Sequence, residues 1–431
     1  MDSTLPRVDA DDSGEVGGSQ PSPPRCDPSL DAPHDDLSQE APPPPLVPAR
    51  PGEFAPLDYR RFQVDPPVVL APMAGVTNQA YRRLCRRFGA GLYVSEMIIA
   101  RGLVEGHAKT RQLAAFHPEE SPRSLQLYGS DPRYLGEATR LLVGEGAVDH
   151  LDLNFGCPVR KVTSQGGGAA IPIKPRLMAK LVGAVVQAAG AVPVTVKVRL
   201  GIDDDHLSYL SSGRVAREEG CVAIGLHART AAQLYDGQAR WPAIGELKSA
   251  TPGIQVLGNG DIYDAGDALT MMRETRCDGV IVGRGCLGRP WLFRELADAF
   301  AGRQPAPAPD LGGVVDVLLR HAALLIELFG ERSAILELRK WCGWYLKGFR
   351  NSGPVRNDLF RASSLAEVEA IVGKLDRTLA YPIGAIRARR CKKSGTQKVA
   401  LPPGYLDSLD DDVAPACAAA LDATLSPTDG G

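Results

Sequence analysis

Eight short apolar or β-branched runs recur along the middle of the chain at a nearly even spacing. They lie at residues 68–74, 92–98, 124–129, 150–156, 193–199, 222–227, 254–259 and 278–283. Stretches with the period of an amphipathic helix separate them, for example residues 80–89, 134–146, 176–190 and 265–274. Eight strand–helix units over about 235 residues are typical of a TIM, or (β/α)8, barrel. We therefore predict this α/β fold, with a doubly wound sheet as the alternative.

The composition is that of a globular protein, with 431 residues, 44% hydrophobic and 23% charged. The longest apolar stretches are much shorter than the roughly 20 residues that a membrane span needs. The N-terminus is acidic and has no apolar core of a signal peptide. Nine scattered cysteines without a C-x-x-C pair are typical of free thiols in a reducing compartment. We therefore expect a cytoplasmic protein that does not contact a membrane.

Proline and charge are unevenly distributed outside the predicted barrel. Residues 1–50 contain eleven prolines and ten acidic residues, which predicts a disordered tail over residues 1–55. Residues 310–398 carry sixteen Lys and Arg against nine Asp and Glu. A solvated helical surface would account for this excess, but the basic cluster at 387–393 favours a polyanionic partner. Beyond residue 390 we expect a flexible tail, 391–431, which is first basic and then acidic.

Polar residues and glycines cluster at the predicted C-terminal ends of the strands, where TIM barrels hold their active sites. After the last two strands, 258–261 and 283–285 offer backbone N–H groups and the Arg284 guanidinium, which suit a phosphate. Tight turns alone would also account for some of the glycines. Lys197 is a lone lysine in a buried-looking run, so we expect an anionic ligand beside it. With Gln126 and the backbone near Ala74, these ends predict a flat, phosphorylated cofactor across the barrel mouth.

Cys157 lies in the sequence NFGCPV (154–159), where the fourth predicted strand gives way to a glycine-rich loop. Pro158 prevents the strand from continuing. A thiol placed at this point can act as a nucleophile or as a proton donor, and a buried structural cysteine is the alternative. The His and Cys residues lack the spacing of metal ligands, so we expect no metal.

Six further segments occur in the order found in a known family, and together they make the chain resemble the bacterial tRNA-dihydrouridine synthases, in particular their B-type members. The segments are 70–84 (LAPMAGVTNQAYRRL), 156–170 (GCPVRKVTSQGGGAA), 194–201 (VTVKVRLG), 226–237 (LHARTAAQLYDG), 258–262 (GNGDI) and 282–293 (VGRGCLGRPWLF). A seventh, 337–348 (ELRKWCGWYLKG), is similar to the tRNA-contacting helix of B-type members. The resemblance extends from about Pro66 to about Ile386.

The resemblance implies an FMN-binding catalytic barrel over residues 56–305 and a helical tRNA-binding domain over residues 310–390. It implies that NADPH reduces FMN, that flavin N5 delivers a hydride to C6 of a tRNA uridine, and that Cys157 protonates C5. The residues implied to hold FMN are Pro72, Met73, Ala74, Gln126, Lys197, His227, Asn259, Gly260, Asp261, Gly283 and Arg284. The residues implied to contact the tRNA substrate are Asn154, Arg229, Lys340 and Lys347.

Two alternatives remain open for the function. A flavoenzyme similar to dihydroorotate dehydrogenase would act on a free pyrimidine and would not need residues 310–398. An RNA-binding barrel without catalysis would need no flavin. We expect a monomer with tRNA and NADPH as partners. The aromatic residues of segment 340–347 either stack on unpaired tRNA bases or form the core of a small bundle.

Overall fold

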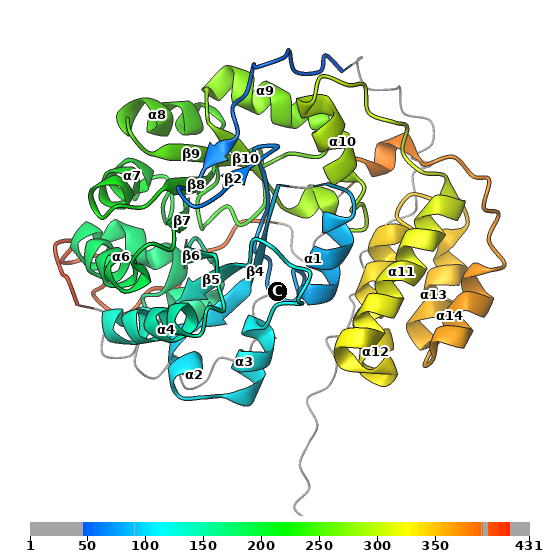
Figure 1. Cartoon of the computed structure of the whole chain (residues 1–431), viewed down its shortest axis with the longest axis horizontal. Helices are drawn as coiled ribbons and strands as arrows, with labels where there is room; N and C mark the ends of the chain where they lie inside the picture. The colour runs from blue at the N-terminus through cyan, green and yellow to red at the C-terminus, as the bar shows by residue number, and fades with distance from the viewer. Residues whose placement is uncertain (1–45, 90, 389, 391–394, 414–431) are drawn as a thin grey trace, which may run out of the picture. The chain divides into compact units, whose positions relative to one another are not determined.

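Eight parallel strands form a closed barrel in the chain, whose computed structural model describes residues 46–89, 91–388, 390 and 395–413. The order around the barrel is β10–β3–β4–β5–β6–β7–β8–β9, so each strand pairs with its neighbours in sequence and the last pairs with the first (Figure 1). The strands are β3 (Val68–Leu70), β4 (Leu92–Ile99), β5 (Ser124–Tyr128), β6 (His150–Phe155), β7 (Val194–Arg199), β8 (Ala223–His227), β9 (Gln255–Asn259) and β10 (Gly279–Val282). The prediction of a TIM barrel is confirmed.

The predicted runs agree with the strands to within one or two residues, except at the first. There β3 ends at Leu70 rather than at residue 74, because Pro72 has no N–H to donate to a neighbouring strand. Both faces of these strands are covered, by helices outside and by side chains inside, which is why Val, Ile and Leu dominate them.

Helices follow the strands and cover the outside of the barrel (Figure 1). They are α1 (Gln79–Arg86), α2 (Ala100–Val104), α3 (Ala108–Ala114), α4 (Pro132–Gly144), α5 (Arg160–Thr163), η3 (Gly168–Ile173), α6 (Pro175–Ala189), α7 (Tyr209–Glu218), α8 (Pro242–Ala250), α9 (Ala265–Thr275), η4 (Arg284–Cys286) and α10 (Leu292–Phe300). Their starts carry recognisable caps. Asp264 and Asp267 form a capping box at α9, and Asp131 followed by Pro132 begins α4.

A short hairpin that the sequence did not reveal closes the N-terminal end of the barrel. It consists of β1 (Leu57–Asp58) and β2 (Gln63–Val64), which pair antiparallel. Leu57, Tyr59 and Val64 pack with the side chains of the barrel interior in one buried cluster. Strands of two residues have no periodicity to detect, so only the packed structure identifies them.

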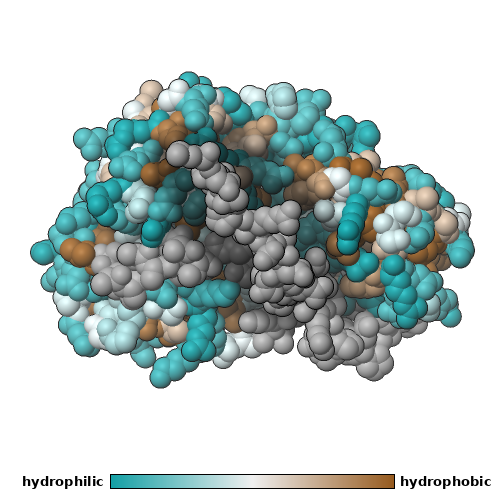
Figure 2. Space-filling model, turned by 90° about the horizontal axis from the view of Figure 1, so that it is seen from below, coloured by the Kyte–Doolittle hydropathy of each residue, from teal (hydrophilic) through white to brown (hydrophobic). Residues whose placement is uncertain are grey.

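A helical region follows the barrel, and the predicted all-α C-terminal region is thereby confirmed. It contains α11 (Leu311–Phe329), α12 (Glu331–Tyr345), α13 (Ser352–Arg361), α14 (Leu365–Val372) and η5 (Ile383–Ala385). Helix α11 packs against α12 and against α1 of the barrel. In Figure 2 hydrophobic residues are most conspicuous on the side of the helical region. Leu336 of α12 is among the exposed large hydrophobic residues.

Two segments that we assigned to the tails are in fact packed on the barrel. Within residues 46–55, Ala49 is buried and its N–H bonds the carbonyl of Ala299, while Glu53 forms an ion pair with Arg273 at 2.7 Å. Burial is also seen within residues 395–413, where Tyr405 is only 4% exposed. The boundaries at 55 and 391 are therefore wrong. Residues 1–45, 391–394 and 414–431 lie outside the described residues.

No helix in the described part of the chain combines the length and the apolarity needed to cross a membrane. The longest one, α11, is amphipathic and packed within the protein.

Candidate functional site

Cys157 lies directly after β6, where Asn154 fixes the turn that presents it. The Asn154 side-chain oxygen accepts hydrogen bonds from the backbone N–H of Gly156 at 3.1 Å and of Cys157 at 2.9 Å. Its amide nitrogen donates to the Gln126 oxygen at 2.8 Å. Asn154 therefore positions the cysteine, whereas its predicted contact with a substrate stays a prediction.

The loop after Cys157 folds back onto it. The backbone N–H of Ala169 bonds the Cys157 carbonyl at 3.0 Å. Gly168 has a φ of +53°, and a Cβ there would lie 2.7 Å from the Cys157 carbonyl oxygen. Only glycine fits this position without displacement of the cysteine. The glycines at 166–168 thus allow the returning part of the loop to pack closely against the part that carries Cys157.

The Cys157 side chain is half-buried. Burial raises the pKa of its thiol, while the Val159 backbone N–H and the positive charge of Arg199 act in the opposite direction. The thiol is therefore protonated at neutral pH, which is the state required of a proton donor.

Cationic side chains from neighbouring strand ends converge beside this cysteine. Lys197 and Arg199 lie two residues apart on β7, so they share the face that points into the barrel. Arg229 follows β8, and Arg284 follows β10. Together with His227, the last residue of β8, they form what we call the cation cluster: Lys197, Arg199, His227, Arg229 and Arg284.

The pKa values within the cation cluster reflect this crowding. Burial, followed by the charge of Arg199, lowers the pKa of Lys197 to about 7, and Asp152 only partly offsets this. Burial, followed by the charges of Arg199, Lys197, Arg229 and Arg284, holds the pKa of His227 well below its usual range. His227 is therefore neutral. The site carries more positive charge than its own acids compensate, which favours an anionic ligand.

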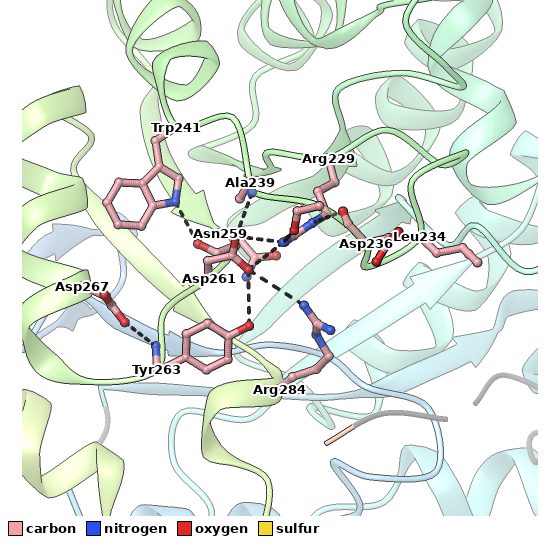
Figure 3. A network of polar contacts seen from close by, with 12 residues as sticks. Arg229, Leu234, Asp236, Ala239, Trp241, Asn259, Asp261, Tyr263, Asp267 and Arg284 are labelled. Atoms are coloured by element: carbon pink, nitrogen blue, oxygen red, sulfur yellow. Dashed lines mark hydrogen bonds and ion pairs between the residues drawn. The ribbon is translucent and has the colours of Figure 1, made fainter. Parts of the chain in front are cut away.

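Asp261 is the carboxylate at the centre of the adjoining polar network (Figure 3). Its two oxygens accept from Arg229 Nη2 at 2.7 and 2.8 Å, and one also accepts from the Ala239 N–H at 2.7 Å. Arg284 Nη2 lies 4.0 Å away. A carboxylate repels a phosphate, so the side chain of Asp261 orients the two arginines rather than holding a phosphate itself.

Asn259, Gly260 and Gly283, also predicted to hold the cofactor, shape the backbone at the ends of β9 and β10. Asn259 donates to the Ile281 carbonyl at 2.7 Å and ties β9 to β10. Gly260 has a φ of +130°, and a Cβ there would lie 2.7 Å from the Ala239 side chain. A Cβ on Gly283 would lie 3.9 Å from the Met73 sulfur. The ends of β3 and β10 are thus neighbours, as the sequence predicted.

The structure offers a direct test of whether an anionic cofactor fits this site. Arg229 is 1% exposed, and its Nη1 is buried without a hydrogen-bond partner among the residues that the structure describes. The Arg284 guanidinium stacks 4.4 Å from the Tyr235 ring centre, and its ion pair with Asp261 is long, at 4.0 Å. A buried, unsatisfied guanidinium nitrogen is costly unless a ligand supplies an acceptor. The residues present therefore fit a phosphorylated group such as FMN.

Gln126 is bonded to side chains of the barrel interior. It is 1% exposed, its nitrogen donates to Asp152 at 2.6 Å, and its oxygen accepts from Asn154. Asp152 is itself buried, and burial raises its pKa to about 6. Gln126 links the strand that carries Cys157 to the polar interior, and its bond to the cofactor stays a prediction.

A small internal cavity of about 20 Å³ lies beneath these groups. Pro72, Asp152, Thr195 and Lys197 are among the residues that line it. A volume of this size holds one water molecule when polar partners are present. Gly225 leaves room for Lys197 here, because a Cβ on Gly225 would lie 2.9 Å from the Lys197 Cδ.

Lys340 of α12 contacts the loop that carries Pro72, Met73 and Ala74. Its ammonium donates to the Gly75 carbonyl and to Glu337. The Gly75 N–H in turn donates to Glu96 of β4, whose pKa is raised by burial. Lys340 thus joins the helical region to the predicted flavin loop, and its contact with tRNA stays a prediction, as does that of Lys347.

The aromatic segment 340–347 belongs mostly to the core. Trp341 is fully buried and packs with Tyr81 of α1 at a ring-centre distance of 4.4 Å. Trp344 is partly buried against Trp341. Of the two alternatives, stacking on tRNA bases is therefore wrong for Trp341, because its ring is used to attach α12 to the barrel.

Sequence reasoning missed Arg199 and Tyr235. Arg199 donates to the carbonyls of Gly156, Thr230 and Leu234 at 2.9, 3.0 and 2.7 Å, so it joins the cysteine turn to the loop after β8. Its position two residues after Lys197 was the signal that could have revealed it. Among the described residues, no group of three His, Cys, Asp or Glu is arranged to hold a metal ion.

The site is thus a cysteine beside a cation cluster at one end of a closed α/β barrel. The family model described as dihydrouridine synthase matches residues 69–379. The chain belongs to the dihydrouridine synthase family.

Curated relatives agree with this assignment. The chain is 51% identical over 355 residues, 80% of its length and 91% of the relative's, to "Probable tRNA-dihydrouridine synthase" of Mycobacterium tuberculosis (strain CDC 1551 / Oshkosh). It is 48% identical to the protein of that name from Mycobacterium leprae (strain TN), over 80% of this chain and 97% of the relative. It is 40% identical to "tRNA-dihydrouridine synthase B" of Xanthomonas axonopodis pv. citri (strain 306), over 70% and 90% of the two chains.

Proposed function

We propose that the protein reduces specific uridines of tRNA to 5,6-dihydrouridine, with bound FMN and with NADPH as the reductant. The observation that carries this proposal is the pairing of a protonated thiol, Cys157, with the cation cluster at one end of the barrel. Family membership and the names of the relatives support the substrate class.

The cation cluster would hold the anionic parts of FMN. Arg284 and Arg229 would bind the phosphate. The ion pair of Arg284 with Asp261 is long, at 4.0 Å, and Nη1 of Arg229 has no hydrogen-bond partner among the described residues. Lys197 would face the isoalloxazine of FMN. A negative charge on this ring system would raise the pKa of Lys197 and keep its ammonium protonated. When bound, FMN supplies the hydride for the C5–C6 bond of the uracil.

Cys157 would donate the proton that completes the reduction at C5. Burial keeps the thiol protonated before the reaction. After the proton leaves, the Val159 N–H and the charge of Arg199 would stabilise the thiolate, because both favour the ionised form. Arg199 also holds the Gly156 carbonyl at 2.9 Å, next to the cysteine. The same residue thus fixes the position of the acid and its electrostatic environment.

The target uridine has to leave its stack to reach the barrel mouth, at a cost that contacts with the RNA backbone must offset. The helical region and its basic residues are the proposed surface for these contacts. Lys340 and Lys347 remain candidates there. Phosphate contacts would make the affinity for tRNA fall steeply with salt.

The decisive experiment is mass spectrometry of tRNA from cells that lack this protein, compared with the parent strain. Loss of the two additional hydrogens at a defined uridine, and their return when the purified flavoprotein and NADPH are added to that tRNA, would support the proposal. A colourless protein, or a yellow protein that turns over free orotate or dihydroorotate and leaves tRNA unchanged, would refute it.

A further inference from the structure

Residues 395–413 run along the barrel beside α6, where Figure 1 shows them in red, and contact the loop that carries Cys157. We call this segment the C-terminal strap. At its beginning, the side-chain nitrogen of Gln397 donates to the Pro158 carbonyl at 2.8 Å and to the Ala231 carbonyl at 3.1 Å. Its backbone N–H bonds the Ala232 carbonyl at 2.8 Å. One side chain therefore bridges the residue after Cys157 and the loop after β8.

The middle of the strap contacts the returning arm of the cysteine loop. Tyr405 is 4% exposed, and its hydroxyl donates to the Ala170 carbonyl at 3.1 Å and lies 3.4 Å from the Gly166 carbonyl. Its ring packs with Ala170, Ile173 and Ile202 in a small apolar cluster. A buried tyrosine hydroxyl that donates to a loop carbonyl helps to hold the loop in position.

The end of the strap is held by a buried lysine of the barrel. Lys174 is 3% exposed, and its ammonium donates to the Ser408 carbonyl at 2.5 Å and to Asp411 at 2.8 Å. It also lies 4.6 Å from the centre of the Tyr405 ring. Without the strap this ammonium would lose these two acceptors. The strap thus completes the local structure at the start of α6.

The loop itself needs such support. It leaves the barrel at Cys157 and returns through the glycines 166–168, which restrict the backbone least. Within the loop, Ala169 bonds the Cys157 carbonyl. The strap holds both arms from outside, at Pro158 and at residues 166–170. A proton donor acts efficiently only when it is held in the right geometry.

We propose that the C-terminal strap positions Cys157, with Gln397 as the principal positioning residue and the Lys174–Asp411 pair as the anchor. The inference rests on the proposed role of Cys157 as the proton donor. Loss of the strap contacts widens the range of positions of the thiol. Product formation then slows, while flavin binding and its reduction by NADPH do not change. The side chains of Gln397 and Asp411 bond backbone carbonyls, Lys174 and Ser408 rather than the side chains of the cation cluster.

The test uses the full-length flavoprotein and four variants in matched pairs. Gln397→Glu removes the N–H donors at nearly constant size and is compared with Lys398→Ala at the exposed neighbouring residue. Asp411→Asn weakens the anchor and is compared with Asp410→Asn, whose carboxylate is 84% exposed and lies 4.0 Å from Arg176. Two rates are measured: alkylation of Cys157 by iodoacetamide, followed on its own peptide by mass spectrometry, and dihydrouridine formation in tRNA.

We expect Gln397→Glu and Asp411→Asn to raise the alkylation rate and lower kcat for dihydrouridine between about two- and tenfold, the range that one lost hydrogen bond accounts for. The flavin content, the rate of reduction by NADPH and KM for tRNA should not change, and the two control variants should match the parent. Unchanged alkylation, or a parallel loss of flavin and of thermal stability, would overturn the proposal. Alkylation does not depend on tRNA, so it tests the strap even if the proposed reaction is wrong.

Discussion

Replacement of Asp261 by asparagine tests the central electrostatic balance of the site. Arg229 is 2% exposed in the ion pair, and Asp261 is the acid that holds it at 2.7 Å. Removal of one member of a buried pair leaves the other charge without compensation, at a typical cost of about 3–5 kcal/mol. Asp261 is 21% exposed, and asparagine keeps an oxygen for the Ala239 N–H. We therefore expect the free energy of unfolding of the flavin-free protein to fall by about 3 kcal/mol, the lower end of that range.

The assay is urea denaturation followed by tryptophan fluorescence, without and with FMN. The control is Asp204→Asn, whose carboxylate lies 2.7 Å from Arg240 but is 75% exposed, so its loss should cost at most about 1 kcal/mol. With FMN bound, the phosphate would supply an anion to Arg229, and the defect should shrink. A loss as small as that of the control would refute the structural role of Asp261. A defect that FMN leaves unchanged would refute the placement of the phosphate beside Arg229.

Four further outcomes are expected. Cys157→Ala should keep flavin reduction by NADPH and lower dihydrouridine formation in tRNA by about 10²–10⁴-fold, measured by mass spectrometry. Arg284→Ala should weaken FMN binding about ten- to a hundredfold in a fluorescence titration, since it removes a charged hydrogen bond. The pKa of Lys197 falls from 10.5 to about 7 on folding, so the unfolded chain binds more protons between these two pH values. The free energy of unfolding of the flavin-free protein should therefore rise with pH in this range. Lys197→Met should flatten this rise, measured by urea titrations at pH 7 and 9.5. Lys340→Met should lower flavin retention as well as tRNA modification, because Lys340 bonds the Gly75 carbonyl. Loss of a residue that only contacts tRNA would lower gel-shift affinity and modification but leave flavin retention unchanged.

The barrel could be predicted because its signal is repeated and local. Each strand is an apolar run bounded by turn residues, and each pairs with its neighbour in sequence, so the order of elements already determines the sheet. The hairpin β1–β2 and the C-terminal strap have no such signal. Tyr59 and Tyr405 also contact residues more than 90 positions away, namely His150 for Tyr59 and Gly166 and Ala170 for Tyr405, and no local pattern reveals such contacts. Prolines and acidic residues near these segments indicated tails instead.

For the site, the sequence predicted which residues lie there better than it predicted what each of them bonds. The strand ends marked Cys157 together with Lys197, His227 and Arg284, because the C-terminal ends of parallel strands meet at one end of a barrel. Arg229 came from the family resemblance, and Arg199 was missed. Sequence could not tell which polar side chains face a ligand and which bond one another. Asp261 bonds Arg229, and Gln126 bonds Asp152. The expected contact of each residue with the cofactor stays a prediction. The Arg229–Asp261 pair follows from charge, since a buried cation first requires an internal acceptor before it can bind a ligand.

Arg199 shows why such a residue escapes a motif-based reading. Its side chain donates to three backbone carbonyls, those of Gly156, Thr230 and Leu234. Because every residue has a backbone carbonyl, the sequence does not reveal such acceptors. Yet its charge is the one that acts on both Cys157 and Lys197. It lowers the pKa of the lysine and favours the thiolate of the cysteine. One buried guanidinium therefore couples the proposed proton donor to the proposed flavin site, and this coupling follows from two strand positions, 197 and 199, on the same face of β7.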